Sequence, residues 1–309
     1  EFRRVLFRSI MKMNVIRQSN VDRIFNILNH TILSAIFLTV AYPIYFVILA
    51  SISDSKYVNS GKLLIYPKGF HMAGYAYVLR ESRIWLGYGN SILYAVAGTL
   101  LGLFCCLLAG YSLSCRTLPG RKIIMAFMVF TMYFGGGLIP FYLVIKKMNL
   151  LNTRLILIIL GSVSVYNIIL IRTFFRNTIP QELEEAAFID GCGYGKFFFS
   201  IALPLSKAIS AVIALYLSVG YWNSYFNALI LITDKNKVPL QIFLREILLV
   251  STESMQQETV NRESLAEYQR LLEVIKYAVI VVATIPVMCI YPFLQKYFVK
   301  GVMIGSLKG

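Results

Sequence analysis

The sequence predicts an all-α membrane protein with six transmembrane helices, and three observations lead to that prediction. Hydrophobic residues make up 58% of the 309-residue chain and charged residues only 15%, which lies well outside the composition of soluble domains. Six mostly uncharged runs are long enough to cross a hydrocarbon core as helices. Lipid offers no hydrogen-bond partners, so each run must pair its backbone groups internally, as a helix does.

In chain order, the six expected spans are Thr31–Ser51, Ser91–Ser114, Ile123–Ile145, Leu155–Ile171, Ile201–Leu231 and Val274–Leu294. Pro43, Pro140 and Pro286 lie in three of these runs, and each removes a backbone donor and favours a kink. The sequence FGGGLIP, from Phe134 to Pro140, predicts a broken helix that faces protein or a water-filled cavity. Close helix packing through small residues is the alternative interpretation of the three glycines.

The two ends of the chain bear on its organisation and orientation. The first ten residues, EFRRVLFRSI, begin without Met and look like a cloning or sequencing junction, so we expect residues 1–12 to be non-native. Met11 or Met13 is then the expected start, and residues 13–309 form a single membrane domain. An even number of spans puts both termini on one side, and basic residues near both ends favour the cytoplasm, although the bias is moderate.

Several function classes are excluded by the distribution of charge and of reactive residues. The net charge of +15 is spread over termini and loops, which favours anionic lipid headgroups as partners and not nucleic acid. The five cysteines have no CxxC spacing and the two histidines lie far apart, so no disulfide framework and no metal site are expected. No GxSxG elbow or Cys/His pair indicates an enzyme, and we expect no cofactor.

The loop between the fourth and fifth spans, about residues 178–204, predicts a short water-exposed helix. Pro180 suits the first turn, acidic residues complement the N-terminal dipole, and Gly191 is placed to end the helix, which gives a helix over about Gln181–Asp190. A second helix is expected from Tyr194 or Lys196 toward Ile201. The glycines before Lys196 do not form a phosphate loop, because Asp190 stands where the first glycine should be and Phe197 follows the lysine.

This loop resembles a known family signature. Glu185-Ala186-Ala187, Gly191 after three further residues, and Ile201-x-Leu203-Pro204 after nine more match every position of the EAA signature of membrane subunits in binding-protein-dependent ABC importers. Stretches beginning at Phe134, Leu170, Gly220 and Leu294 are similar to the maltose-type, carbohydrate branch. The resemblance covers nearly the whole chain after Met11 and looks closest to permeases for oligosaccharides or polysaccharide fragments.

The resemblance implies the type I permease fold of ABC importers with a cytoplasmic coupling helix that docks in a cleft of the ATPase. Glu185 would pair with a basic ATPase residue, the two alanines would permit close approach, and Gly191 would make the turn. Leu203 and Pro204 would fix the entry into the fifth span. The residues assigned to ATPase coupling are Glu184, Glu185, Ala186, Ala187, Asp190, Gly191, Ile201, Leu203 and Pro204.

A path for a neutral sugar needs uncharged polar side chains and aromatic faces. The candidates are Trp222, Asn223, Tyr225 and Asn227 at the end of the fifth span, with Tyr133 beside the glycine break. An interfacial aromatic belt or interhelical hydrogen bonds are the plainer interpretation of these residues. The charged segment of about residues 233–270 is expected outside the cell, and the resemblance to the maltose-type branch implies that it faces a substrate-binding protein. Its apolar stretch Pro239–Val250 is expected to form a helix that lies on the membrane surface or against that partner, with plain solvation of a long loop as the alternative.

The expected protein is therefore a sugar permease subunit in the bacterial cytoplasmic (inner) membrane, with both termini in the cytoplasm. Its expected partners are a second membrane permease, two cytoplasmic ATPase subunits and an extracytoplasmic sugar-binding protein. An ion-driven secondary sugar transporter is the alternative, and it predicts an ionisable residue in mid-membrane, which none of the six spans offers convincingly. A non-transport scaffold or sensor would carry a soluble domain, which the sequence does not contain.

Overall fold

All regular secondary structure in the described part of the chain is helical. The computed structural model describes residues 19–63, 65–253, 272–289 and 292, and within them the all-α prediction is confirmed. Three helices in these ranges are long and apolar enough to cross a bilayer: α2 (Asn20–Ser51), α5 (Ser82–Ser114) and the helix Leu272–Cys289. Five spans result if each of two bent helix pairs is counted as one.

The first two spans begin earlier than expected, because a polar cap starts each helix before its apolar run. Ser19 and Asp22 form a capping box at the start of α2, and Pro43 is accommodated inside the helix. The Glu81 carboxylate accepts a hydrogen bond from the Arg83 backbone N–H at the start of α5. The apolar runs located both helices in the sequence, while local side-chain hydrogen bonds set where they begin.

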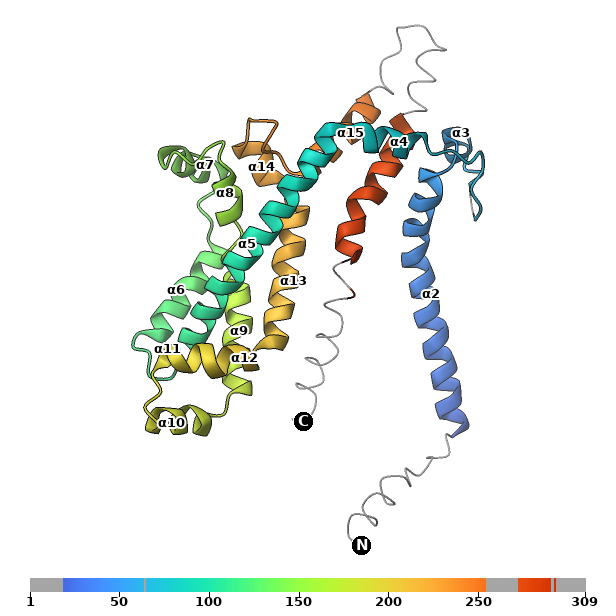
Figure 1. Ribbon diagram of the computed structural model, residues 1–309. Coiled ribbons are helices and arrows are strands. Elements are labelled where there is room, and N and C mark those ends of the chain that lie inside the picture. Colours follow the sequence, from blue (N-terminus) through green and yellow to red (C-terminus); the bar gives the residue numbers. More distant parts are fainter. Residues whose placement is uncertain (1–18, 64, 254–271, 290–291, 293–309) are drawn as a thin grey trace.

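Helix α5 is the central helix of the bundle, and α9 (Val165–Thr178) and α13 (Lys207–Asn223) pack against it (Figure 1). Three glycines on α5 make this contact close. A Cβ atom at Gly98 would lie 2.2 Å from the Tyr221 ring, and one at Gly110 would lie 2.4 Å from Ile171 Cγ2. At Gly102 it would lie 2.4 Å from the Ser162 carbonyl oxygen. Small residues thus let the helix backbones approach each other, as is common in membrane bundles.

The helix expected as the third span is broken at the glycines, as the sequence predicts. Helices α6 (Arg121–Tyr133) and α7 (Leu138–Lys147) meet at 113°. Gly137 has a φ of +82°, which side chains other than glycine rarely adopt. A Cβ atom at Gly135 or Gly136 would find no atom of the described residues within 4 Å, so close packing against this part of the chain does not account for these glycines.

The fourth expected span, Leu155–Ile171, is wrong as one continuous helix. The chain forms α8 (Arg154–Ile159), then an irregular stretch over 160–164 with Gly161 at a φ of +89°, and then α9. The Ser164 hydroxyl accepts from the Asn167 backbone N–H and restarts the helix. Helix α9 continues past Ile171 because Arg172 donates from Nε to the Leu113 carbonyl at the end of α5, which gives that charge a polar partner.

The fifth expected span, Ile201–Leu231, differs at both ends. The segment Tyr194–Leu205 meets α13 at 80°, so the apolar helix along α5 begins only at Lys207. At the other end α13 stops at Asn223, and a separate helix, α14 (Phe226–Leu231), follows. Hydrophobicity alone could not separate these segments, because all of them are apolar.

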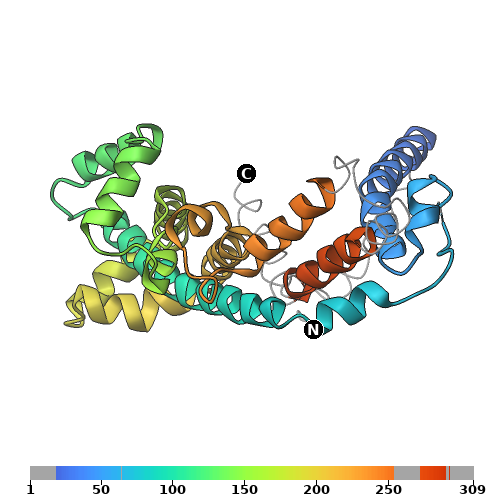
Figure 2. The same ribbon diagram turned by 90° about the horizontal axis from the view of Figure 1, so that it is seen from above.

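Short helices cover the end of the molecule opposite α10 (Gln181–Ile189). These are α3 (Ser55–Asn59), α4 (Ala73–Arg80), α14 and α15 (Leu240–Glu253) (Figure 1). Seen from that end, the protein is an open crescent, with α5 along the convex side, α2 at one tip and α6 with α7 at the other (Figure 2).

Helix α15 agrees with the apolar helix expected over Pro239–Val250, but much of its apolar face packs inside this chain. Leu240, Phe243 and Leu244 are buried against residues of α4 and α5, so this face is not reserved for the membrane or a partner. The proposed non-native residues 1–12, the loop residues 254–270, the end of the sixth span after Cys289 and the C-terminal stretch from Leu294 lie outside the described residues.

Candidate functional site

The loop with the EAA-like sequence folds as predicted, as a short helix ended by a glycine. Pro180 precedes α10 with a φ of −61°, and Glu182 and Glu184 lie in the first turn. At the other end, Gly191 has a φ of +78° and donates its N–H to the Phe188 carbonyl, while Cys192 donates to the Ala187 carbonyl. This is a Schellman motif, which requires the left-handed conformation that glycine adopts without strain.

The inner face of α10 packs on the core of this chain. Ala187 is buried in the cluster that contains Phe175, Phe197 and Phe198. Glu184 is half-buried beside Tyr111 and Arg116 in a cavity of about 350 Å³. Burial is the largest cause of a raised pKa at Glu184, with Glu185 adding to it and the positive charge of Arg116 opposing it. Two of the predicted coupling residues therefore face this chain: Ala187 packs in its core, and Glu184 lines the cavity beneath the helix.

The outer face of α10 is formed by residues at helical spacing: Glu182, Glu185, Ala186 and Ile189 are all exposed. Glu185 accepts a hydrogen bond from Gln181 Nε2 at 2.6 Å, which orients its carboxylate along the helix. Ile189 is 86% exposed and was missed as a candidate. Its spacing of three and four residues from Ala186 and Glu185 could have identified it, because these positions share one side of a helix.

The chain then turns back toward α13 through a helix with a widened turn. The π-helical segment η1 (Phe198–Ala202) joins α11 (Tyr194–Phe197) to α12 (Leu203–Leu205), and Leu203 donates its N–H to the Phe198 carbonyl. Pro204 follows directly and has no N–H to donate. The Ser206 hydroxyl donates to the Leu203 carbonyl at 2.8 Å, at the point where the direction changes by 80°. Ile201 and Leu203 pack against the same core as Ala187.

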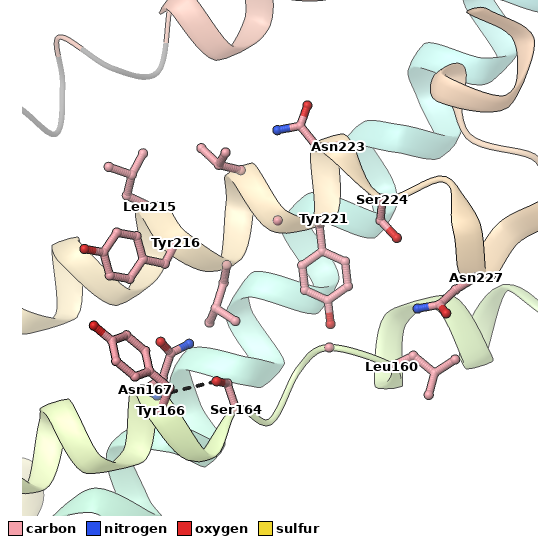
Figure 3. Close-up of a pocket in the computed structure, with 14 residues that line it drawn as sticks. Leu160, Ser164, Tyr166, Asn167, Leu215, Tyr216, Tyr221, Asn223, Ser224 and Asn227 are labelled. Atoms are coloured by element: carbon pink, nitrogen blue, oxygen red, sulfur yellow. Dashed lines mark hydrogen bonds between the residues drawn. The ribbon is translucent and has the colours of Figure 1, made fainter. Parts of the chain in front are cut away.

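Four of the five predicted path residues line two cavities next to α13. The first has a volume of about 740 Å³ and lies between α9 and α13, with Asn223 and Asn227 in its lining (Figure 3). The second has a volume of about 540 Å³ and is lined by Trp222, Asn223 and Tyr225. Asn223, an exposed residue on the last turn of α13, lines both cavities. Both volumes suit a small ligand or one part of a larger one.

The first cavity is lined by aromatic and uncharged polar side chains. Tyr166 and Asn167 contribute from α9, and Tyr216 from α13 (Figure 3). No charged side chain is among the described residues that line it. Tyr221 fixes one wall, because its hydroxyl donates to the Ile158 carbonyl at 2.6 Å. Such a lining can donate and accept hydrogen bonds and can stack on flat apolar faces.

The remaining path candidates differ in their surroundings. Trp222 is buried, and its indole N–H donates to the Ala283 carbonyl at 3.2 Å, which is an interhelical hydrogen bond. Tyr225 lies under the Arg245 guanidinium, 5.8 Å from the ring centre. Tyr133 is not brought together with the others, since it is exposed on α6 and lines a groove beside Arg172 and Arg176. Within the described ranges, no three His, Cys, Asp or Glu side chains are grouped as a metal site.

Comparisons with known proteins agree with this architecture. The family model for the binding-protein-dependent transport system inner membrane component matches residues 98–304. Protein LplC of Bacillus subtilis is 37% identical over 298 residues, covering 96% of this chain and 99% of the relative. The polygalacturonan/rhamnogalacturonan transport system permease protein YtcP of the same organism is 40% identical over 288 residues, covering 93% and 99%.

A solved structure has the same fold. A bacterial ABC transporter involved in the import of the acidic polysaccharide alginate superposes with a TM-score of 0.79 at 33% identity, covering 91% of this chain and 98% of that one. The chain therefore belongs to the family of binding-protein-dependent transport system inner membrane components: it is a multi-pass permease subunit of an ABC importer, and ATP hydrolysis takes place on a separate subunit.

Proposed function

We propose that this chain forms one half of the pore of an importer that moves a sugar or oligosaccharide across the cytoplasmic membrane by alternating access. The observation that carries the proposal is the outer face of α10, where Glu185, Ala186 and Ile189 are exposed although the inner face is buried. A helix this short is marginal in isolation and gains stability from a partner. An exposed isoleucine between acidic residues suits a protein cleft with an apolar floor and a basic rim.

In this proposal, ATP binding closes two ATPase subunits and α10 passes their movement to the spans. Glu185 pairs with a basic residue of the ATPase, Ala186 permits close approach, and Ile189 fills an apolar pocket. Asp190 and Gly191 end the helix, while Ile201, Leu203 and Pro204 hold the returning segment at a fixed angle to α13. Burial of Ala187 and Phe197 couples the loop to α5 and α9, because these side chains share one core.

The proposed topology has six spans, with α8 and α9 as a broken fourth span. The end of the molecule that carries α10 faces the cytoplasm, and α2 begins at that same end (Figure 1). Both termini are therefore cytoplasmic in this proposal. The concave side of the crescent is completed by a second, related permease, which gives a heterodimer. The extracytoplasmic sugar-binding protein docks on the opposite end, where α15 lies within the segment of residues 233–270.

The proposed substrate is a saccharide, which the names of YtcP and of the alginate importer support by analogy. Asn223 is the residue proposed to contact it first, because it lines both cavities. Asn227 and Tyr225 extend the path on either side. Trp222 shapes the wall of the second cavity, because its indole N–H donates to the Ala283 carbonyl of the helix Leu272–Cys289. Tyr133 enters the path only if another conformation brings α6 closer.

The test measures ATPase co-purification and saccharide-stimulated ATP hydrolysis in vesicles that contain the whole importer. Glu185→Lys and Ile189→Ala are compared with Glu246→Lys, which makes the same charge reversal at an exposed position of α15. Both α10 variants should lower co-purification by about fivefold or more, since loss of an interface anchor costs above ~1 kcal/mol. Glu246→Lys should retain the ATPase.

A fourth variant separates the path from the coupling surface. Asn223→Ala should lower saccharide uptake while the ATPase still co-purifies. Equal co-purification by all three charge and truncation variants would contradict the coupling role of α10. Uptake that follows an ion gradient without any ATPase would support the secondary-transporter alternative, which family membership does not favour.

A further inference from the structure

A groove between α6 and α9 combines positive charge with an apolar floor. It has a volume of about 680 Å³, and four cations line one end: Arg121, Lys122, Arg172 and Arg176. The rest of its lining is mostly apolar and includes Met125, Val129 and Phe130. None of the described lining residues is acidic. A groove of this kind is complementary to a ligand with an anionic head and an apolar tail.

Two of the arginines are held in position by the end of α5. Arg172 donates from Nε to the Leu113 carbonyl at 3.2 Å, and Arg121 donates from Nη1 to the Cys115 carbonyl at 3.1 Å. A guanidinium has five N–H donors, so each arginine keeps further donors for another acceptor. Phosphate oxygens are acceptors that arginine binds with two parallel hydrogen bonds. The cationic end is thus partly organised before any ligand arrives.

The four charges also oppose one another. Arg121 and Arg172 both donate to carbonyl groups at the end of α5, and Arg176 lies one helical turn after Arg172 on α9, so these positive charges lie close together. An anion between these side chains relieves that repulsion, because it lies close to several cations at once. The described residues of the groove offer no carboxylate that could do so.

The groove has the position and length that a lipid needs. Its cationic end adjoins the loop before α6, where Thr117 and Tyr194 of α11 share a hydrogen bond of 2.7 Å, so it lies on the α10 side of the molecule. Helix α6 has 13 residues and is about 20 Å long, which exceeds the ~15 Å depth of one hydrocarbon leaflet. No residue of α6 is buried, and Phe130 and Phe134 stack at 4.5 Å near its far end.

We propose that this groove binds an anionic phospholipid of the inner leaflet, with its phosphate between the four cations and an acyl chain along α6. Basic pockets between transmembrane helices on the cytoplasmic side are a known form of lipid recognition. A zwitterionic lipid fits less well, because its own cation faces the cluster. Arg176 also lines the cavity beneath α10, so the lipid would lie beside the segment that supports the outer coupling face.

Native mass spectrometry of the full chain, purified with its partners and titrated with phosphatidylglycerol or phosphatidylcholine, tests the proposal. Lys122→Gln with Arg176→Gln removes two exposed cations that make no hydrogen bond to a described residue. Each basic residue near anionic lipid contributes about fivefold in affinity, so phosphatidylglycerol binding should weaken by about tenfold or more. Val129→Trp, which fills the groove and leaves its charges intact, should also weaken binding.

The matched control is Lys146→Gln with Lys147→Gln, which removes the same charge from exposed positions of α7 in the same bent span. This control should bind phosphatidylglycerol like the unmodified chain. Equal loss in the control, or equal binding of the two lipids by the unmodified chain, would overturn the proposal. So would unchanged binding in Val129→Trp, since the charges alone would then explain retention. Lipid that binds the isolated chain and is excluded from the assembled importer would show that a partner protein covers the groove, which also overturns it.

Discussion

Replacing Gly102 by alanine tests the packing of α5 against the break between α8 and α9. The new Cβ atom would lie 2.4 Å from the Ser162 carbonyl oxygen and 3.0 Å from Leu217 Cδ1. Carbon–oxygen contacts normally begin at about 3.3 Å, so the backbones must separate by roughly 1 Å. The Ser162 oxygen belongs to the main chain and cannot rotate away as a side chain could.

The expected cost follows from comparison with a second glycine on the same helix. A Cβ atom at Gly89 would meet no atom of the described residues within 4 Å, so Gly89→Ala gains only helix propensity, about 1 kcal/mol. Gly102→Ala gains the same propensity but adds an overpacking cost of about 1–3 kcal/mol. The difference between the two variants therefore isolates the packing term, and it should make Gly102→Ala the less stable by about 1–3 kcal/mol.

The assay is the thermal denaturation midpoint of the full chain in one detergent, measured for both variants side by side. Gly102→Ala should unfold a few degrees below Gly89→Ala, since ~1 kcal/mol corresponds to about 2–4 °C in domains of about 150–250 residues. Equal midpoints, or a more stable Gly102→Ala, would refute the close contact between α5 and residues 160–164.

Two further predictions concern the loop that contains α10. Gly191→Ala should destabilise the end of α10 by about 1–2 kcal/mol because φ is +78° there. Gly195→Ala should not, because φ at Gly195 is not positive and a Cβ atom there meets no described atom within 4 Å. Faster amide hydrogen exchange across residues 186–192 in Gly191→Ala alone is the expected signature, and equal exchange in both variants would contradict it. Burial raises the pKa of Glu184 above its ordinary 4.5, so the folded chain holds this proton more tightly than the unfolded chain does. The stability of the unmodified chain relative to Glu184→Gln should therefore fall as the pH rises from below 4.5 to above the raised pKa of Glu184. Thermal midpoints of both chains at acidic and neutral pH measure this difference. A difference that grows with rising pH would show that the charge of Arg116 outweighs burial.

Much of the α10 loop could be predicted because its signals are local. Pro180 and the acidic first turn begin the helix, and Gly191 ends it through its own backbone conformation, so neighbours along the chain were sufficient. The break at Gly135–Gly137 was predictable for the same reason. The composition and the runs of apolar residues were enough for the all-helical membrane fold, because a bilayer permits few other solutions.

The sequence by itself determined the fold class, the family signature and the ends of α10, whereas the tertiary structure decided which way these residues point. Ala186 and Ala187 are adjacent and chemically identical, yet one is exposed and the other is buried against Phe197. The break in the fourth span and the 80° turn before Lys207 depend on distant partners, including the close approach of Gly102 to Ser162. An apolar run indicates that a segment avoids water. Only packing against other helices fixes the direction in which the segment runs, because lipid and protein interior are almost equally apolar.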